Sequence, residues 1–303
     1  MNNKVVIVGC GNVGMSYAYA LINRKTKVDE IVLIDRKEDK AHGEALDLNH
    51  GIPFGPGHMI IKQGTYEDCK DAKIVCICAG ASQEPGETRL DLINKNIIVF
   101  NDVLKNVMES GFNGIFLIAT NPVDIMTYYT AKITQFPSNK VIGTGTTLDT
   151  ARLKYLIGLK INIDSKDINA YVIGEHGDSE FVPWSLATIS LQNIKDFISE
   201  EELEEIYVSV RDAAYEIIAA KGHTCYGIGM MLVRITNAIL GNEMAILPVS
   251  TYDVKNDVYI GLPSIIGSTG ASRKINIKLT PEEEVKLQNS INVIKDAMKD
   301  ADI

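Results

Sequence analysis

The chain has 303 residues, of which 46% are hydrophobic, and its 39 acidic and 30 basic side chains give a net charge of −9 at neutral pH. A surface of that sign repels phosphate backbones and anionic lipids, so nucleic acid and membrane partners are not expected. No apolar run reaches the roughly 18 residues of a membrane span and the first is too short for a signal peptide, so we expect a soluble, cytoplasmic protein.

Short β-rich runs alternate with helical patterns in the first half of the chain. Strands are predicted at residues 5–8, 31–34, 59–61, 74–78, 115–119 and 141–142, and helices at 13–24, 38–48 and 89–110. This order requires right-handed crossovers and predicts an α/β fold with a mostly parallel, doubly wound Rossmann sheet.

The first predicted strand runs into a glycine-rich turn. In "VVIVGCGNVG", Gly9, Gly11 and Gly14 have the G-x-G-x-x-G spacing, which lets a pyrophosphate approach backbone N–H groups at a helix N-terminus. The second strand, "IVLID", ends in Asp35, whose carboxylate can accept hydrogen bonds from both ribose hydroxyls and repels a 2′-phosphate. The pattern favours NAD over NADP, although the neighbouring Arg36 leaves some tolerance. The alternative is a glycine-rich turn without a ligand.

A long connection follows the fourth predicted strand. "AGASQEPGETRLDL", residues 79–92, holds two further glycines, carboxylates and one arginine before its helix begins. A strand-to-helix connection ordinarily needs about 2 to 6 residues. The surplus predicts a loop that has a function of its own.

The rhythm changes after "VIGTGTTLD", and we expect a boundary there between a cofactor-binding domain, residues 1–143, and an α+β catalytic domain, residues 144–303. Ser199 with Glu202 and Thr280 with Glu283 have the spacing of capping boxes, and each predicts the start of a long helix. The five cysteines are interpreted as buried, reduced thiols, and no metal site is expected. They are Cys10, Cys69, Cys76, Cys78 and Cys225.

Three motifs carry side chains suited to chemistry. "VIGEHGDSEFVPW" places His176 between two glycines, where a ligand can approach an imidazole whose pKa range suits proton exchange; a satisfied core histidine is the alternative. "GTTLDTARL" places Asp149 and Arg152 on one face of a helix, as site residues or as a surface ion pair. "IATNPVD" places Asn121 at a strand end, where ligands of open α/β sheets bind. The remaining histidines, His42, His50, His58 and His223, lack such a setting.

With these motifs the chain resembles bacterial-type NAD-dependent L-lactate dehydrogenases of the lactate/malate dehydrogenase family. "GCGNVGMS", "LID", "GETRLDL", "TNPVD", "LDTAR", "GEHGDS" and "KGHTCYGIG" occur in the family's order over nearly all of the chain. "GEHG" and "TNP" are shared with malate dehydrogenases and do not choose the substrate. The resemblance implies reversible reduction of pyruvate to L-lactate by NADH in fermentative glycolysis, and a homotetramer.

The resemblance also implies roles for matching residues. His176 would exchange a proton with the C2 oxygen, Asp149 would orient and stabilise the protonated imidazole, Arg152 would grip the substrate carboxylate, and Arg89 would polarise the ketone. Gln83 matches the position that discriminates substrates, and a neutral side chain there cannot compensate the second carboxylate of oxaloacetate. Asn121 and Thr224 match substrate-pocket residues. Cofactor contacts are expected from Gly9, Gly11, Asn12, Val13, Gly14, Asp35, Ala79, Gly80, Asn121 and Ile228.

One site departs from the family's pattern. Many bacterial members bind fructose 1,6-bisphosphate through an arginine and a histidine, and the matching positions here hold Lys154 and Asn169. Because lysine lacks the bidentate fork and asparagine is neutral, weak or absent activation is predicted. Two other functions stay open: a broader L-2-hydroxyacid dehydrogenase for branched or longer 2-keto acids, and a catalytically idle NAD-binding sensor.

Overall fold

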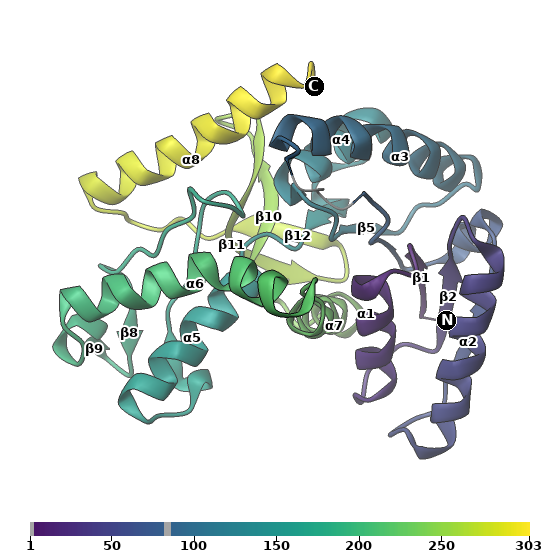
Figure 1. Cartoon of the computed structure of the whole chain (residues 1–303), viewed down its shortest axis with the longest axis horizontal. Coiled ribbons are helices and arrows are strands. Elements are labelled where there is room, and N and C mark those ends of the chain that lie inside the picture. Colours follow the sequence, from purple (N-terminus) through teal and green to yellow (C-terminus); the bar gives the residue numbers. More distant parts are fainter. Residues whose placement is uncertain (1–2, 82–85) are drawn as a thin grey trace.

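The computed structural model describes residues 3–81 and 86–303 (Figure 1). Its first half follows the predicted alternation of strands and helices. The elements in order are β1 (Lys4–Val8), α1 (Asn12–Ile22), β2 (Glu30–Ile34), α2 (Glu38–Gly51), β3 (Ile60–Gln63), β4 (Ile74–Ile77), α3 (Arg89–Glu109), β5 (Ile115–Ile118), α4 (Val123–Thr134) and β6 (Val141–Gly143). All six predicted strands are therefore present, whereas α4 was not predicted.

The second half is richer in helices. Its elements are α5 (Thr147–Ile161), β7 (Ile168–Asn169), β8 (Thr188–Ile189), β9 (Gln192–Asn193), α6 (Glu200–Lys221), α7 (Tyr226–Gly241), β10 (Ala245–Asp253), β11 (Val258–Gly267), β12 (Gly270–Lys274) and α8 (Pro281–Asp300). The predicted capping boxes are formed by Ser199 with Glu202 at α6 and by Thr280 with Glu283 at α8. A third box, Thr88 with Asp91, starts α3.

One nine-stranded sheet runs through the molecule in the order β12-β11-β10-β6-β5-β4-β1-β2-β3. Strands β1 to β6 are parallel, which confirms the predicted Rossmann sheet. The antiparallel strands β10, β11 and β12 extend that sheet beyond β6, a continuation that the sequence did not indicate. The separate sheet β7-β8-β9 packs with α5 and α6 (Figure 1).

Alternate residues of the central strands face different helices. Val5 and Ile7 of β1 pack in a core with α1, α2 and α7, while Val6 and Val8 pack in a second core with α3 and α4. Because both faces are covered, β1 is buried along its whole length and shows no polar alternation. Helix α8 completes the packing over β11, α3 and α4 through a third apolar cluster that includes Ile294.

The strand order reverses between β1 and β4, and chains leave those two neighbouring strands in different directions. Such a switch point at the carboxyl ends of the strands is where open α/β sheets bind ligands. None of the helices in the described part of the chain combines the length and the apolar content that crossing a membrane requires.

Candidate active site

The glycine-rich turn lies at the switch point, and at Gly9 and Gly14 it leaves no room for a side chain. Gly9 has φ +104°, and a Cβ there would lie 2.5 Å from the backbone nitrogen of Ala79, the residue that follows β4 and Cys78. A Cβ on Gly14 would lie 2.1 Å from the Gly9 carbonyl oxygen, so α1 packs directly on the turn. Gly11, the N-cap of α1, instead faces open space. This cradle fits a pyrophosphate at the α1 N-terminus.

Asp35 is fixed beside that turn. Its two carboxylate oxygens accept hydrogen bonds from the backbone N–H groups of Cys10 and Lys37, each at 2.9 Å. The carboxylate is therefore held at the end of β2 next to the glycines, as ribose recognition requires. Asn12 is exposed and Val13 half-buried at the first turn of α1. The turn and Asp35 together fit NAD.

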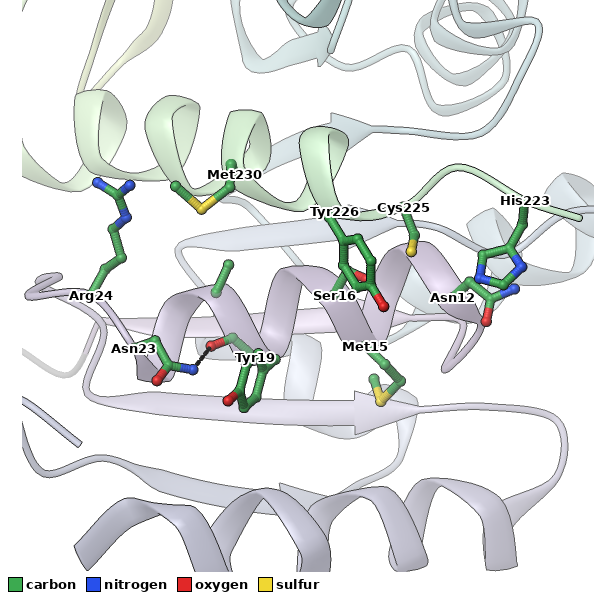
Figure 2. Close-up of a pocket in the computed structure, with 11 residues that line it drawn as sticks. Asn12, Met15, Ser16, Tyr19, Asn23, Arg24, His223, Cys225, Tyr226 and Met230 are labelled. Atoms are coloured by element: carbon green, nitrogen blue, oxygen red, sulfur yellow. Dashed lines mark hydrogen bonds between the residues drawn. The ribbon is translucent and has the colours of Figure 1, made fainter. Parts of the chain in front are cut away.

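A groove of about 460 Å³ opens between α1 and α7 (Figure 2). Asn12 and His223 line one part of it, and Tyr19, Tyr226 and Met230 line its flanks. Asp149, Arg152 and His176 are not among the residues that line it. Tyr19 is 62% exposed and Tyr226 is 73% exposed on the flanks of this groove.

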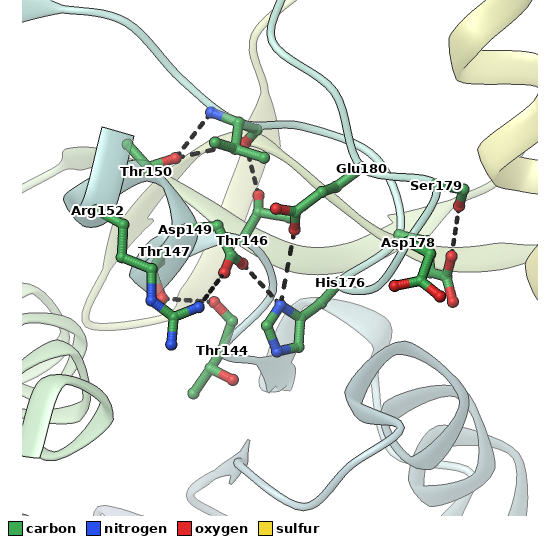
Figure 3. A network of polar contacts seen from close by, with 12 residues as sticks. Thr144, Thr146, Thr147, Asp149, Thr150, Arg152, His176, Asp178, Ser179 and Glu180 are labelled. Carbon is green, nitrogen blue, oxygen red and sulfur yellow. Dashed lines mark hydrogen bonds and ion pairs between the residues drawn. The ribbon is translucent and has the colours of Figure 1, made fainter. Parts of the chain in front are cut away.

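The predicted reactive residues do come together (Figure 3). Asp149 and Arg152 project from the first turns of α5, and His176 comes from the loop after β7. Nδ1 of His176 lies 2.6 Å from Oδ2 of Asp149, and Nη1 of Arg152 donates a hydrogen bond of 2.8 Å to Oδ1. Asp149 is 2% exposed. The pair is thus a buried carboxylate that orients an imidazole, with an arginine alongside, and not a surface ion pair.

The buried pair shifts both pKa values toward the charged forms. Burial alone would lower the pKa of His176, but the carboxylate of Asp149 and its hydrogen bond outweigh burial and raise that pKa to about 9. Burial alone would raise the pKa of Asp149, but His176 and Arg152 hold it below its usual value. An imidazole that is protonated at neutral pH and faces a substrate oxygen is suited to general acid catalysis.

A second carboxylate, which the sequence did not single out, holds the backbone of His176. The His176 N–H donates a hydrogen bond of 2.8 Å to Oδ2 of Asp124, and the Ser250 hydroxyl donates to the other oxygen. Asp124 is 2% exposed, and burial raises its pKa to about 6. Asp124 is the last residue of the motif "TNPVD", so its position three residues after Asn121 was the sequence signal by which it could have been found.

Arg89 is the first residue of α3 and forms an ion pair with Glu175, the residue before His176. Its side chain is 39% exposed, whereas that of Glu175 is only 1% exposed. Glu175 also accepts a hydrogen bond from the Ser179 hydroxyl, and its backbone N–H donates 2.6 Å to Oγ of Ser290. The structure thus brings Arg89 to the His176 loop, but paired with a carboxylate.

Asn96 is a further residue that the sequence did not indicate. It is fully buried in α3, where its Oδ1 accepts a hydrogen bond of 2.7 Å from the Ala81 N–H and its Nδ2 donates one of 2.7 Å to the Asn121 carbonyl. One side chain therefore joins the loop after β4 to the loop after β5. The side chain of Asn121 remains exposed at that edge of the sheet, and Gly80 lies close to Thr120 there.

The other predicted residues are distributed around this centre. Thr224 lies between α6 and α7 and Ile228 in the first turn of α7, both half-buried. Lys154 is on α5 with its ammonium group 5.5 Å from the ring centre of Tyr171, and Nδ2 of Asn169 lies 3.4 Å from the Thr188 hydroxyl. Gln83, the predicted specificity residue, lies outside the described residues.

The five cysteines are free thiols; four of them are buried, as predicted, whereas Cys78 is only partly buried. Asp149, His176 and Glu180 form the one cluster of possible metal ligands within residues 3–81 and 86–303, with ligand atoms within 4.8 Å of one another. However, Nδ1 of His176 is already engaged by Asp149. We therefore treat these three residues as a hydrogen-bonded group.

Two family profiles cover almost the entire chain. The profile of the lactate/malate dehydrogenase NAD binding domain matches residues 3–143, and that of the lactate/malate dehydrogenase alpha/beta C-terminal domain matches residues 146–302.

Curated relatives and solved structures agree with these profiles. The chain is 52% identical over 298 residues to L-lactate dehydrogenase of Halalkalibacterium halodurans, covering 97% of this chain and 96% of the relative, and 48% identical over 306 residues to L-lactate dehydrogenase 1 of Bacillus cereus, covering 98% and 97%. The crystal structure of a lactate dehydrogenase from a Medee basin deep-sea metagenome library superposes with a TM-score of 0.96 at 51% identity, covering 100% and 99%. The ligand-bound minor L-lactate dehydrogenase of Enterococcus mundtii gives 0.96 at 44% identity, covering 98% of each chain.

Proposed function

Since the chain belongs to the lactate/malate dehydrogenase family and is an NAD-dependent L-lactate dehydrogenase, we propose that Asp149, Arg152 and His176 carry its reaction. The observation that supports this assignment is the contact of 2.6 Å between His176 and Asp149, with Arg152 bonded to the same carboxylate. A ketone held by its neighbouring carboxylate on Arg152 would place its oxygen near the imidazole.

His176 is the proposed proton donor and acceptor. In pyruvate reduction, the protonated imidazole would donate from Nε2 to the C2 oxygen, and in lactate oxidation the neutral imidazole would take that proton back. Asp149 accepts the hydrogen bond from Nδ1, which fixes the ring orientation and stabilises the imidazolium. Asp124 holds the backbone N–H of the same residue, so both the ring and the main chain of His176 are positioned.

Arg152 is the proposed substrate clamp. One of its donors is used on Asp149, which leaves further guanidinium N–H groups for a carboxylate. Figure 3 shows the side chains of Arg152 and His176 on either side of Asp149. The arrangement matches a 2-keto acid, in which the carboxylate and the reacting carbonyl are adjacent. Asn121 and Thr224 are proposed to complete this pocket.

NAD supplies the hydride acceptor and, when reduced, the hydride donor. Gly9, Gly11 and Gly14 would receive its pyrophosphate at the N-terminus of α1, with Asn12 and Val13, and Asp35 would accept hydrogen bonds from a ribose. Ala79, Gly80, Asn121 and Ile228 are proposed to contact the cofactor farther along. This assignment is supported by the space left at Gly11 and by the fixed carboxylate of Asp35.

Arg89 is proposed to polarise the substrate ketone, which requires its guanidinium to exchange Glu175 for the substrate oxygen. The ion pair with Glu175 supports this role, because it holds Arg89 at the residue adjacent to His176. The cationic group would then stabilise charge that develops on the oxygen. A preference for pyruvate over oxaloacetate is proposed from the neutral Gln83, which lies outside the described residues.

Assembly, location and regulation complete the proposal. We propose a homotetramer, and the exposed tyrosines of the groove between α1 and α7 are the kind of surface that a subunit contact covers. The two domains are proposed as residues 1–143 and 144–303, and the location as the cytoplasm. Fructose 1,6-bisphosphate is proposed to activate weakly or not at all, because Lys154 lacks the bidentate fork of an arginine and Asn169 carries no charge.

The assignment of His176 is tested with His176→Gln. Pyruvate-dependent oxidation of NADH is expected to fall by about 10²- to 10⁴-fold, while NADH binding measured by fluorescence titration stays within about twofold. His42→Gln is the control, because His42 is exposed on α2. Retained turnover in the His176 variant would refute proton exchange at this residue. Comparing pyruvate with 2-ketoisocaproate on the same protein separates a lactate enzyme from the broader 2-hydroxyacid alternative.

A further inference from the structure

Glu180 is a buried carboxyl group that lies against the proposed catalytic pair. It is 3% exposed, its Oε2 lies 4.0 Å from Nδ1 of His176, and its ligand atoms fall within 4.8 Å of those of Asp149 and His176. Figure 3 shows its side chain on the far side of Asp149 from Arg152. The reaction as proposed above gives this group no task.

The surroundings of Glu180 and Asp149 differ. The carboxylate of Asp149 lies 2.8 Å from Nη1 of Arg152 and 2.6 Å from Nδ1 of His176. Among the described residues, the basic nitrogen within 4.0 Å of the Glu180 carboxyl group is Nδ1 of His176, at 4.0 Å. Two buried carboxyl groups whose oxygens lie within 4.8 Å of each other cannot both be ionised without a large electrostatic cost. The negative charge therefore resides on Asp149, which has the two cationic partners, and the proton resides on Glu180.

We propose that Glu180 is a positioning residue: its neutral carboxyl group donates a hydrogen bond to Asp149 and thereby leaves Asp149 as the single negative charge beside Nδ1 of His176. The backbone holds it in place, because its N–H donates 3.1 Å to the Gly177 carbonyl and its own carbonyl accepts 2.7 Å from the Tyr207 hydroxyl. The inference rests on the proposed role of His176.

The charges around the site agree with a neutral Glu180. Burial and the neighbouring Asp149 raise the pKa of the Glu180 carboxyl well above its usual value. The titratable and charged groups that face the cluster are Asp149 and Arg152 from α5, Asp124 from α4, Tyr207 from α6, and Glu175 and His176 from its own loop. Arg152 bonds Asp149, and Arg89 of α3, a second arginine near this loop, is paired with Glu175.

A neutral Glu180 has a consequence for turnover. Negative charge beside the imidazolium opposes the transfer of its proton to the substrate. With Asp149 alone ionised beside Nδ1, the imidazolium is stabilised but still acidic, whereas a second carboxylate at Glu180 would make it hold the proton more tightly. The hydrogen bond from Glu180 would also keep Asp149 in the orientation that meets Nδ1.

The test compares Glu180→Gln with Glu180→Leu in the full-length enzyme, with kcat/KM for L-lactate oxidation measured across the pH range in which His176 titrates. The amide keeps a hydrogen-bond donor without charge, so the Gln variant should stay within about twofold of the parent, with its pH limb in place. The Leu variant lacks the donor, so its kcat/KM should fall by about tenfold or more. Glu283→Gln is the control, a buried glutamate that caps α8 and bonds Ser185.

Each outcome decides the matter. A limb that moves down by a pH unit or more in the Gln variant would show that Glu180 was ionised, and unchanged kinetics in both variants would show that it positions nothing; either result overturns the inference. A carboxylic C=O stretch in the infrared spectrum of the parent that disappears in the Gln variant supports it without reference to turnover, and decides the protonation state even where the Leu variant does not fold. An inactive parent enzyme would instead count against the proposed function.

Discussion

Nδ1 of His176 lies 2.6 Å from Oδ2 of Asp149, although 27 positions separate the two residues in the chain. The carboxylate reaches this point from α5, and the imidazole from a loop whose backbone is anchored to Asp124 on α4. The contact links a charge to an orientation, since it raises the pKa of the imidazole while it fixes the ring. The following predictions depend on this relationship or on the residues that surround it.

The two directions of the reaction should depend on pH in opposite ways. The pKa of His176 is raised from 6.5 to about 9, so pyruvate reduction, which needs the imidazolium, should be level at neutral pH and decline as pH rises toward and past about 9. Lactate oxidation, which needs the neutral ring, should rise over the same range. Because the folded-state pKa is raised, the stabilisation of the pair is complete below pH 6.5 and is lost as pH approaches 9. Initial rates in both directions measure this, and parallel pH profiles would contradict it.

Asp149→Asn should lower kcat for pyruvate by about 10²- to 10⁴-fold, because the amide removes the charge that stabilises the imidazolium and disturbs the orientation of the ring. Its pH limb should move to lower values. Asp178→Asn is the matched control, since Asp178 is exposed on the loop that carries His176 and accepts a hydrogen bond from Tyr215. Steady-state kinetics of both variants check the prediction, which fails where the Asn variant keeps the pH profile of its parent.

Asp35→Ser should weaken the preference of the enzyme for NADH over NADPH. Loss of the carboxylate removes charge-assisted hydrogen bonds to the ribose, so KM for NADH should rise by about 10- to 100-fold, while a 2′-phosphate would no longer be repelled. The measurement is kcat/KM for NADH and NADPH with pyruvate saturating. Asp39→Ser on the exposed first turn of α2 should leave both values unchanged. An unchanged NADH preference in the Asp35 variant would count against ribose binding at this carboxylate.

Asn96→Ala should cost about 1 to 3 kcal/mol in the free energy of unfolding, because it leaves the Ala81 N–H and the Asn121 carbonyl without their buried partner. It should also raise KM for pyruvate, since the two loops at the site would lose their connection. Asn106→Ala is the control, because Asn106 is half-buried on the same helix and its side-chain amide donates to the Asp102 carbonyl within that helix. Urea denaturation and steady-state kinetics separate the two effects, and equal stability of both variants would show that Asn96 does not join the loops.

The sequence predicted the parts of the fold that depend on local pattern. The glycine turn, the six parallel strands and the capping boxes at Ser199 and Thr280 each have a signal within a few residues. The addition of β10, β11 and β12 to the edge of β6 has none, because strand order is decided by tertiary packing across more than a hundred residues. The sequence pattern did not predict helix α4, whose apolar residues face two neighbours, the sheet and α8.

The same distinction holds for the site. Motifs indicated Asp149, Arg152 and His176, and the structure brings them into contact. Asn96 and Glu180 were not singled out, because a buried polar residue in a helix or loop looks like any surface residue until its partners are known. The ion pair of Arg89 with Glu175 likewise joins two motifs that are far apart in the chain.

The most direct test of the central claim follows NADH absorbance with purified protein, which is given pyruvate and then oxaloacetate at equal concentration without any sugar phosphate. The account predicts fast oxidation of NADH with pyruvate and little with oxaloacetate. Faster oxidation with oxaloacetate would mean that a cation balances the second carboxylate of the substrate, and it would contradict the proposed preference for pyruvate.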